Sequence, residues 1–300
     1  MKKSRIIQGL MRLDNIDEDR LYEIIKFDLD NDIYFFDLAD IYCRGESEAK
    51  LGRVLKAHPE LREKMFIQTK GSIRFSPETG GYYDLSYKHI KEAVYDSLGR
   101  LGIDYLDSFL LHRPDIFIDA KEVAKAFNEL YLEGKVKHFG VSNFSKELIE
   151  YISTDLKQKI EYNQVQLGLG HMPMVEEVFN YNTPFDEGIN RSSESFFYLK
   201  RKGIIIQAWS PFIMKFFEGS LFDENKFPEI NNVLNKMADK YQTSKCAIAT
   251  AFLLKLDKDL LVITGSTNID HIKESIDGEK VNLSKEDWYA IYKETGHKLP

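Results

Sequence analysis

Short apolar runs of strand length alternate with runs of helix length along almost the whole chain. The strand candidates are residues 6–13, 33–39, 65–69, 104–112, 135–143, 161–167, 202–211 and 260–266. The clearest helix candidates between them are 46–58, 87–101 and 120–134, where apolar residues recur at spacings of three and four. Because parallel strands need a long crossover and a helix supplies it, this alternation favours a parallel α/β sheet.

Eight strand candidates favour closure of that sheet into a (β/α)8 barrel, the TIM barrel. Such a barrel needs about 250 residues, and the chain has 300. No Pro-, Ser- or Gly-rich linker divides the sequence, so we expect a single α/β domain over residues 1–300. An open, doubly wound sheet is the alternative. It would carry G-x-G-x-x-G after its first strand, and this chain has no such motif.

The charge and composition exclude several classes of protein. A formal net charge of −7 argues against a nucleic-acid surface, which needs clustered lysine and arginine. No apolar run approaches the roughly 18 residues of a membrane span, and the amino terminus has no signal-peptide pattern. Cys43 and Cys246 lie far apart and form no C-x-x-C pair, as in reduced intracellular proteins. We therefore expect a cytoplasmic protein with no nucleic-acid or membrane partner.

Four chemically active side chains stand at or just past the carboxyl ends of three strand candidates. Asp37 and Tyr42 come from FFDLADIY, Lys70 from FIQTKG and His112 from FLLHRPD. The carboxyl ends of the strands form the catalytic face of a (β/α)8 barrel. We therefore expect a carboxylate, a phenol, an amine and an imidazole to converge at one site.

These four groups predict a site that donates a proton to a carbonyl oxygen. A tyrosine phenol has a reference pKa of about 10 and is a weak donor unless its surroundings stabilise the phenolate. We expect the Lys70 ammonium to lower the pKa of Tyr42, and Asp37 to keep Lys70 charged and oriented. His112 would hydrogen-bond the substrate oxygen, so that the group stabilises the oxyanion formed by hydride transfer.

Each of the four residues has a plainer explanation when it is taken alone. A single polar residue at the start of a loop is more often solvated or capping than catalytic. All four in order, each at a strand end, favour catalysis. A Schiff base at Lys70 is a different possibility, but it leaves the later motif GVSNF unexplained. No metal is expected, since the seven histidines show no H-x-x-x-H or Cys/His ligand spacing.

Several motifs resemble those of the aldo-keto reductases over essentially the whole chain. FDLADIY is similar to the family's F-D-x-A-x-x-Y, LLHRPD to L-x-H-x-P-D, and GKVKHFGVSNF is a nearly complete match to G-K-[IV]-R-x-[IL]-G-V-S-N-[FY]. NQVQ and AWSP are similar to N-Q-V-E and A-Y-S-P. The chain looks nearest to a bacterial subgroup with DHADIY, IHRPD and VRHFGVSNF. The resemblance implies an NAD(P)H-dependent oxidoreductase that reduces an aldehyde or ketone, a small-molecule carbonyl, as a monomer.

The resemblance also implies a role for each matched position. Tyr42 is the proton donor, with Asp37, Lys70 and His112 as its catalytic partners. Ser142, Asn143 and Gln164 bind the nicotinamide carboxamide, and Trp209 stacks on the nicotinamide ring. The remaining cofactor positions are Ser210, Pro211 and Phe212 along the pyrophosphate, and Gly9, Met11 and Arg12 where the first strand meets the cofactor.

The segment after the eighth strand departs from the family's 2′-phosphate motif, K-S-x-N-x-x-R-[IL]-x-E-N. Gly265 replaces the lysine, His271 the arginine and Ser275 the asparagine, whereas Ser266, Asn268 and Glu274 match. Arginine suits bidentate phosphate binding, and a neutral histidine holds a dianion less firmly. We expect NADPH as the cofactor, with NADH as the alternative that this atypical site leaves open.

A second function of another class fits the same motifs. The potassium-channel β subunits of this family hold the cofactor but serve mainly as regulatory partners. A cofactor-sensing module with vestigial turnover is therefore the alternative to a reductase. The substrate itself is not legible, because loops 74–84, 171–190 and 212–227 have no ligand code. Their aromatic side chains either line an apolar pocket or pack the loops onto the barrel; these are Tyr82, Tyr83, Phe185, Phe216 and Phe217.

Overall fold

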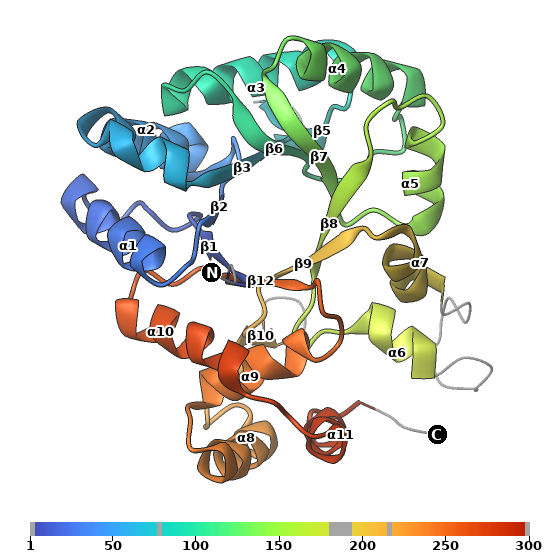
Figure 1. Cartoon of the computed structure of the whole chain (residues 1–300). Helices are drawn as coiled ribbons and strands as arrows, with labels where there is room; N and C mark the ends of the chain where they lie inside the picture. Colours follow the sequence, from blue (N-terminus) through green and yellow to red (C-terminus); the bar gives the residue numbers. More distant parts are fainter. Residues whose placement is uncertain (1–3, 77–79, 180–193, 215–217, 298–300) are drawn as a thin grey trace. The chain divides into compact units, whose positions relative to one another are not determined.

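The computed structural model describes residues 4–76, 80–179, 194–214 and 218–297. Eight parallel strands close into a barrel in the order β1-β12-β9-β8-β7-β6-β3-β2 (Figure 1). They are β1 (Ile6–Gly9), β2 (Phe35–Asp37), β3 (Phe66–Gly71), β6 (Leu106–Leu111), β7 (Val136–Ser142), β8 (Ile160–Gln166), β9 (Ile205–Trp209) and β12 (Leu261–Thr264). The (β/α)8 fold predicted from the alternation of strands and helices is confirmed.

The chain forms two compact units, which are described separately. The first is Met1–Gln164 with Gly265–Thr267, and the second is Val165–Thr264 with Asn268–Pro300. That all 300 residues act as one domain stays a prediction.

In the first unit each strand is hydrogen-bonded to its neighbour in a parallel register, from β1 through β2, β3, β6 and β7 to β8. The helices are α1 (Glu18–Asp30), α2 (Glu46–Ala57), α3 (Tyr87–Leu101), α4 (Ala120–Leu132) and α5 (Lys146–Ile152), with 3-10 turns η1 (Tyr42–Gly45) and η2 (Pro59–Lys64). Figure 1 shows these five helices outside the strands.

Sequence explains where these helices begin and end. Asp17, Ser86, Asp119 and Ser145 each accept a backbone N–H of the first turn and so cap α1, α3, α4 and α5. Gly134 adopts φ +67 just beyond the end of α4, as glycine commonly does at a helix stop. The helix packs inward through Phe127, whose ring stacks on Phe139 of β7 at 4.3 Å. Buried aromatic pairs of this kind pack the helices against the strands.

The second unit contains the parallel pair β9 and β12 and the remaining helices. These helices are α6 (Pro173–Phe179), α7 (Glu194–Lys202), α8 (Pro228–Tyr241), α9 (Lys245–Leu254), α10 (Ile269–Asp277) and α11 (Lys285–Glu294), with the 3-10 turn η4 (Gly278–Lys280). Trp288 of α11 stacks on Phe252 of α9 at 4.7 Å and donates its indole N–H to the Phe252 carbonyl at 2.9 Å. This contact anchors the carboxyl-terminal helix to α9.

Loops predicted as irregular carry regular structure in part. Residues 74–84 belong largely to an antiparallel hairpin of β4 (Ile73–Ser76) and β5 (Gly80–Tyr83). Segment 212–227 includes a second hairpin, β10 (Ile213–Met214) and β11 (Gly219–Ser220), and α6 occupies the start of 171–190. Period-two and period-3.6 patterns are weak in such short elements, so the sequence does not reveal them. Phe185, Phe216 and Phe217 lie outside the described residues.

Candidate active site

The structure brings the four predicted catalytic side chains together in the first unit. Asp37 is the last residue of β2, Lys70 lies near the end of β3, and His112 directly follows β6. These three strands are consecutive neighbours in the parallel sheet. Tyr42 opens the turn η1 just beyond β2. Parallel neighbours end at one edge, which is why positions far apart in sequence meet there.

Lys70 and Asp37 form a buried ion pair. The Lys70 ammonium lies 2.8 Å from each carboxylate oxygen of Asp37 and donates a third hydrogen bond, 2.5 Å, to the Leu38 carbonyl. Burial opposes the charge on Lys70, but the carboxylate of Asp37, the Tyr42 phenol and their hydrogen bonds outweigh it, so the pKa of Lys70 is raised. The amine is therefore a protonated, fully satisfied ammonium group.

Two amide side chains also donate hydrogen bonds to Asp37. Gln68 Nε2 donates to Asp37 Oδ1 at 2.8 Å, and Gln164 Nε2 donates to the same oxygen at 3.0 Å. The sequence interpretation missed Gln68 and did not expect Gln164 to contact Asp37. A signal for Gln68 was present, since it precedes Lys70 by two residues and so faces the same side of β3. These donors fix the position of the carboxylate inside the protein.

Tyr42 lies between Lys70 and His112. The Lys70 ammonium is 4.9 Å from the centroid of the Tyr42 ring, and the His112 ring meets the same ring edge-on at 6.0 Å and 81°. Burial raises the pKa of Tyr42 and outweighs the lowering by Lys70, so the net direction is upward. The expectation of a lowered pKa for Tyr42 is therefore wrong for this structure. Burial removes the water that would stabilise the phenolate, and the Lys70 ammonium compensates for only part of that loss.

His112 is buried and neutral. Burial, followed by the charges of Lys70 and Arg113, lowers the pKa of His112 well below its usual value. Its Nδ1 is buried and has no hydrogen-bond partner among the described residues. Buried polar atoms are almost always paired, so an orphaned ring nitrogen beside Tyr42 is typical of a group that meets a ligand.

The ends of β7 and β8 present polar side chains next to the catalytic four. Ser142 ends β7 and its hydroxyl accepts from the Asn143 amide at 3.0 Å. Asn143 adopts φ +58, and its backbone N–H donates to the Gln164 carbonyl at 2.9 Å. Asn163 clamps the backbone of Phe144 in both directions, at 3.4 and 2.9 Å. The GVSNF motif thus comprises the end of β7 and a turn held by the following strand.

The residues predicted to meet the cofactor near the first strand differ in exposure. Gly9 is buried at the end of β1, and Gln8 Nε2 donates to the Gly9 and Ser266 carbonyls at 3.2 and 3.0 Å. Met11 and Arg12 are exposed. Ser266 is therefore tied to β1 through its backbone, and the Met11 and Arg12 side chains are accessible to solvent.

In the second unit, Trp209 ends β9 and begins an unusual turn. Ser210 adopts φ +47, and the Ile213 N–H donates to the Ser210 carbonyl at 3.2 Å. A Cβ at Gly168 would lie 2.5 Å from the Pro211 carbonyl oxygen, so glycine is required for this close approach. The Phe212 ring packs on Phe222 at 5.5 Å. The AWSP segment and the residue after it are therefore closely packed in this structure.

In the atypical segment 265–275, two of the three departures from the motif, Gly265 and His271, lie in open positions, whereas Ser275 is fully buried. A Cβ at Gly265 would meet no heavy atom within 4 Å, and His271 is exposed. The Asn268 carboxamide caps α10 by accepting the Asp270 N–H at 2.9 Å. Glu274 is half-buried on the same helix. The acidic first turn and the occupied cap both weaken this helix start as an anion site.

The donor set fits a nicotinamide cofactor. A carboxamide needs both acceptors and donors, and Ser142, Asn143 and Gln164 offer a hydroxyl and two amides at the ends of adjacent strands. Among the described residues, no three His, Cys, Asp or Glu side chains gather so as to hold a metal ion. In the same part of the chain, no helix has the length and apolarity that crossing a bilayer requires.

Comparison with known proteins points to one family. A sequence model described as "Aldo/keto reductase family" matches residues 5–293. The chain is 30% identical to oxidoreductase YdhF of Escherichia coli over 99% of this chain and 95% of that protein. It is also 30% identical to a 6-dehydroglucose reductase of Agrobacterium fabrum, over 97% of this chain and 94% of that protein.

Solved structures agree with the fold. An aldo-keto reductase from a Medee basin deep-sea metagenome library is 26% identical, covers 100% of this chain and 94% of its own, and superposes with a TM-score of 0.72. An aldo-keto reductase from Bacillus halodurans, solved in its holo form, is 24% identical, covers 100% and 95%, and has a TM-score of 0.74. The second supports the fold alone.

Proposed function

This chain belongs to the aldo/keto reductase family, and we propose that it reduces an aldehyde or ketone to an alcohol with Tyr42 as proton donor. It is an NAD(P)H-dependent oxidoreductase. The observation that carries the proposal is the position of the Lys70 ammonium, 2.8 Å from Asp37 and 4.9 Å from the centroid of the Tyr42 ring. A phenol beside a buried, paired ammonium can release its proton when an acceptor forms nearby.

The nicotinamide, when bound, supplies the hydride that reduces the carbonyl carbon. Tyr42 stays protonated at neutral pH, because burial raises the pKa of its phenol. It therefore begins the reaction as a donor. As its proton passes from Oη to the carbonyl oxygen, the Lys70 ammonium stabilises the growing phenolate. Asp37, held by Gln68 and Gln164, keeps Lys70 from rotating away.

We assign His112 to orientation of the substrate. The imidazole is neutral, since burial and the nearby cations lower its pKa, so it can donate one hydrogen bond without adding charge. Its edge-on approach to Tyr42 aims it at the region that the phenol serves. An orienting hydrogen bond of this kind fixes the carbonyl for hydride attack and proton transfer together.

Carbonyl-bearing sugars are the substrates to test first. Two of the relatives are named 6-dehydroglucose reductases, and that name describes such a compound. In this chain the β4–β5 hairpin presents Phe75, Tyr82 and Tyr83 with exposed rings. Aromatic faces of this sort bind the apolar face of a sugar ring and leave its hydroxyls hydrated.

We propose NADPH as the cofactor, held at the carboxamide by Ser142, Asn143 and Gln164 and at the rings and phosphates by Trp209 and the other predicted positions. NADH is tested beside it, since Gly265 and His271 replace the usual basic residues. Action as a monomer in the cytoplasm also stays a prediction. Light scattering on the purified protein tests the oligomeric state.

Loss of reduced-nicotinamide absorbance with sugar carbonyls, simple aldehydes, dicarbonyls and ketones tests the proposal. We expect turnover in the wild type and at least about a hundredfold less in Tyr42→Phe, the loss that general acid catalysis typically supplies. The control variant is Tyr95→Phe, which removes an exposed hydroxyl on α3. No turnover in the wild type despite measurable NADPH binding, or equal turnover in Tyr42→Phe, overturns the proposal.

A further inference from the structure

Asp40 is a half-buried acid two residues before Tyr42 that the proposed reaction does not use. Its backbone N–H donates to the Lys70 carbonyl at 3.0 Å, which ties the loop after β2 to β3. Its Oδ1 is buried and has no hydrogen-bond partner among the described residues. A Cβ placed on Gly71 would lie 3.1 Å from the other oxygen, Oδ2, so the carboxyl lies against the backbone of β3.

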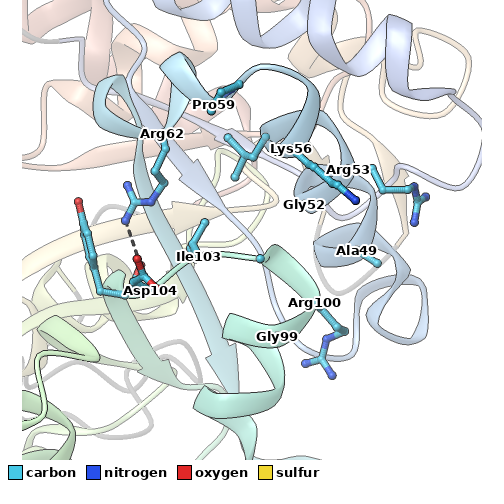
Figure 2. Close-up of a pocket in the computed structure, with 13 residues that line it drawn as sticks. Ala49, Gly52, Arg53, Lys56, Pro59, Arg62, Gly99, Arg100, Ile103 and Asp104 are labelled. Carbon is cyan, nitrogen blue, oxygen red and sulfur yellow. Dashed lines mark hydrogen bonds between the residues drawn. The ribbon is translucent and has the colours of Figure 1, made fainter.

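A second acid, Glu48 of α2, faces the same region. Glu48 is fully buried and accepts hydrogen bonds from Thr69 Oγ1 at 2.5 Å and Arg100 Nε at 2.7 Å. Arg100 also donates to Ser97 Oγ at 3.3 Å. It extends from α3 beside a cleft of about 630 Å³ lined by parts of α2, η2, α3 and residues 102–105 (Figure 2).

The turn that carries Tyr42 meets this cluster at both ends. Asp40 stands just before the turn, and Gly45 closes it at φ +89. A Cβ on Gly45 would lie 3.0 Å from Arg100 Cδ, so the arginine stem packs on the end of the turn. Inside the turn, Cys43 and Arg44 both have positive φ, 49 and 57. A left-handed conformation is unfavourable for residues other than glycine, so neighbouring contacts must hold it.

Charge in the cluster is finely balanced. Burial, followed by the charge of Glu48, raises the pKa of Asp40 to about 7. The charge of Arg100, a hydrogen bond from the Ile41 backbone to Asp40 and the charge of Lys70 act in the opposite direction. Arg100 is already paired with Glu48, and Lys70 with Asp37. Each cation is therefore shared with another carboxylate, so ionised Asp40 would face Glu48 without an ion-pair partner of its own.

We propose that Asp40 is a positioning residue for Tyr42 and acts as the neutral carboxylic acid, lying against β3 within electrostatic range of the Glu48–Arg100 pair. Loss of its proton sets its carboxylate against the buried carboxylate of Glu48 and displaces the strained turn, which moves the Tyr42 hydroxyl. Reduction then slows as pH rises past neutrality. The inference rests on the proposed function for its kinetic readout, but the protonation of Asp40 is measurable without turnover.

The test compares kcat against pH for the wild type, Asp40→Asn and Asp40→Ala. In the wild type kcat falls by about tenfold, a change of about 1.4 kcal/mol in the barrier, with a midpoint near the pKa of Asp40, about 7. Asp40→Asn, which imitates the neutral acid, lacks this step. Asp40→Ala loses activity at all pH values, whereas Asp40→Asn retains activity. A step of the same size and midpoint in Asp40→Asn overturns the inference.

Infrared pH-difference spectra and a second variant complete the design. The wild type should show a protonated-carboxyl band at pH 6 that Asp40→Asn lacks, whatever its activity. Glu48→Gln removes the facing charge, so the kinetic step should move to lower pH. A wild type without turnover refutes the proposed function. The protonated-carboxyl band then still shows whether Asp40 is neutral at pH 6. Tyr42-dependent turnover without the band refutes the Asp40 inference alone.

Discussion

Lys70 Nζ lies 2.8 Å from both carboxylate oxygens of Asp37, and both side chains are buried. This pair argues against the Schiff-base alternative. A lysine nucleophile must be a neutral amine, usually with a lowered pKa, whereas the net effect of the Lys70 surroundings is to raise its pKa. The same pair makes Lys70 a fixed positive charge beside the Tyr42 phenol, which suits proton donation.

Breaking this pair should damage both stability and catalysis. We expect Asp37→Asn to lower the free energy of unfolding by about 3–5 kcal/mol, because it leaves a buried ammonium unpaired, and to abolish most turnover. The double variant Asp37→Asn/Lys70→Met removes that unpaired charge. It should regain stability but not activity. Denaturant unfolding and kcat measure the two effects, and recovery of activity in the double variant would contradict the assigned roles.

His112 should make the protein sensitive to acid. Burial and two cations lower the pKa of His112 below its unfolded value of about 6.5. The folded state then binds fewer protons than the unfolded state, so stability is present above about pH 6.5 and is lost as pH falls below it. In His112→Asn this contribution disappears. The melting temperature of the wild type minus that of His112→Asn should therefore be larger at pH 7.5 than at pH 5.

Asp28 should destabilise the fold at neutral pH. Its carboxylate is fully buried in α1, neither oxygen has a hydrogen-bond partner among the described residues, and burial raises its pKa well above the usual value. The folded state binds more protons, so stability falls as pH rises from about 4. Asp28→Asn should gain about 1–3 kcal/mol at pH 8 and little at pH 4. Asp30→Asn, exposed on the same helix, is the matched control and should stay within about 0.5 kcal/mol at both.

Basic residues placed in the atypical phosphate segment should strengthen NADPH binding selectively. Gly265→Lys is sterically open, since an added Cβ meets nothing within 4 Å, and His271 is exposed. We expect Gly265→Lys/His271→Arg to tighten the NADPH Kd by about tenfold or more, as a charged hydrogen bond of about 1.5–3 kcal/mol allows. The NADH Kd should not change. Calorimetric titration measures both, and equal tightening of NADH binding would show that the segment does not contact a 2′-phosphate.

Electrostatic balance was the least predictable part of the site. The sequence places Lys70 near Tyr42 and so predicts a lowered phenol pKa, but burial reverses the direction. How deeply a side chain is buried depends on every element packed around it, and no local pattern reports that. Gln68, Glu48 and Asp40 were overlooked for a related reason. Each is a polar residue within an otherwise ordinary strand, helix or loop. Its role depends on the side chain that the fold places beside it.

By itself the sequence determined the (β/α)8 fold and the order of the four catalytic candidates. Strand and helix periodicity are local, and parallel strands must end at a common edge, so Asp37, Lys70 and His112 could be assigned to one face before any coordinates. Only the tertiary structure decided the hydrogen bonds of Asp37, the lack of a partner for His112 Nδ1 among the described residues, and the electrostatic effect of Glu48 and Arg100 on Asp40. Distances of a few ångströms and desolvation are set by packing between segments far apart in sequence, and these determine the charge that each group carries.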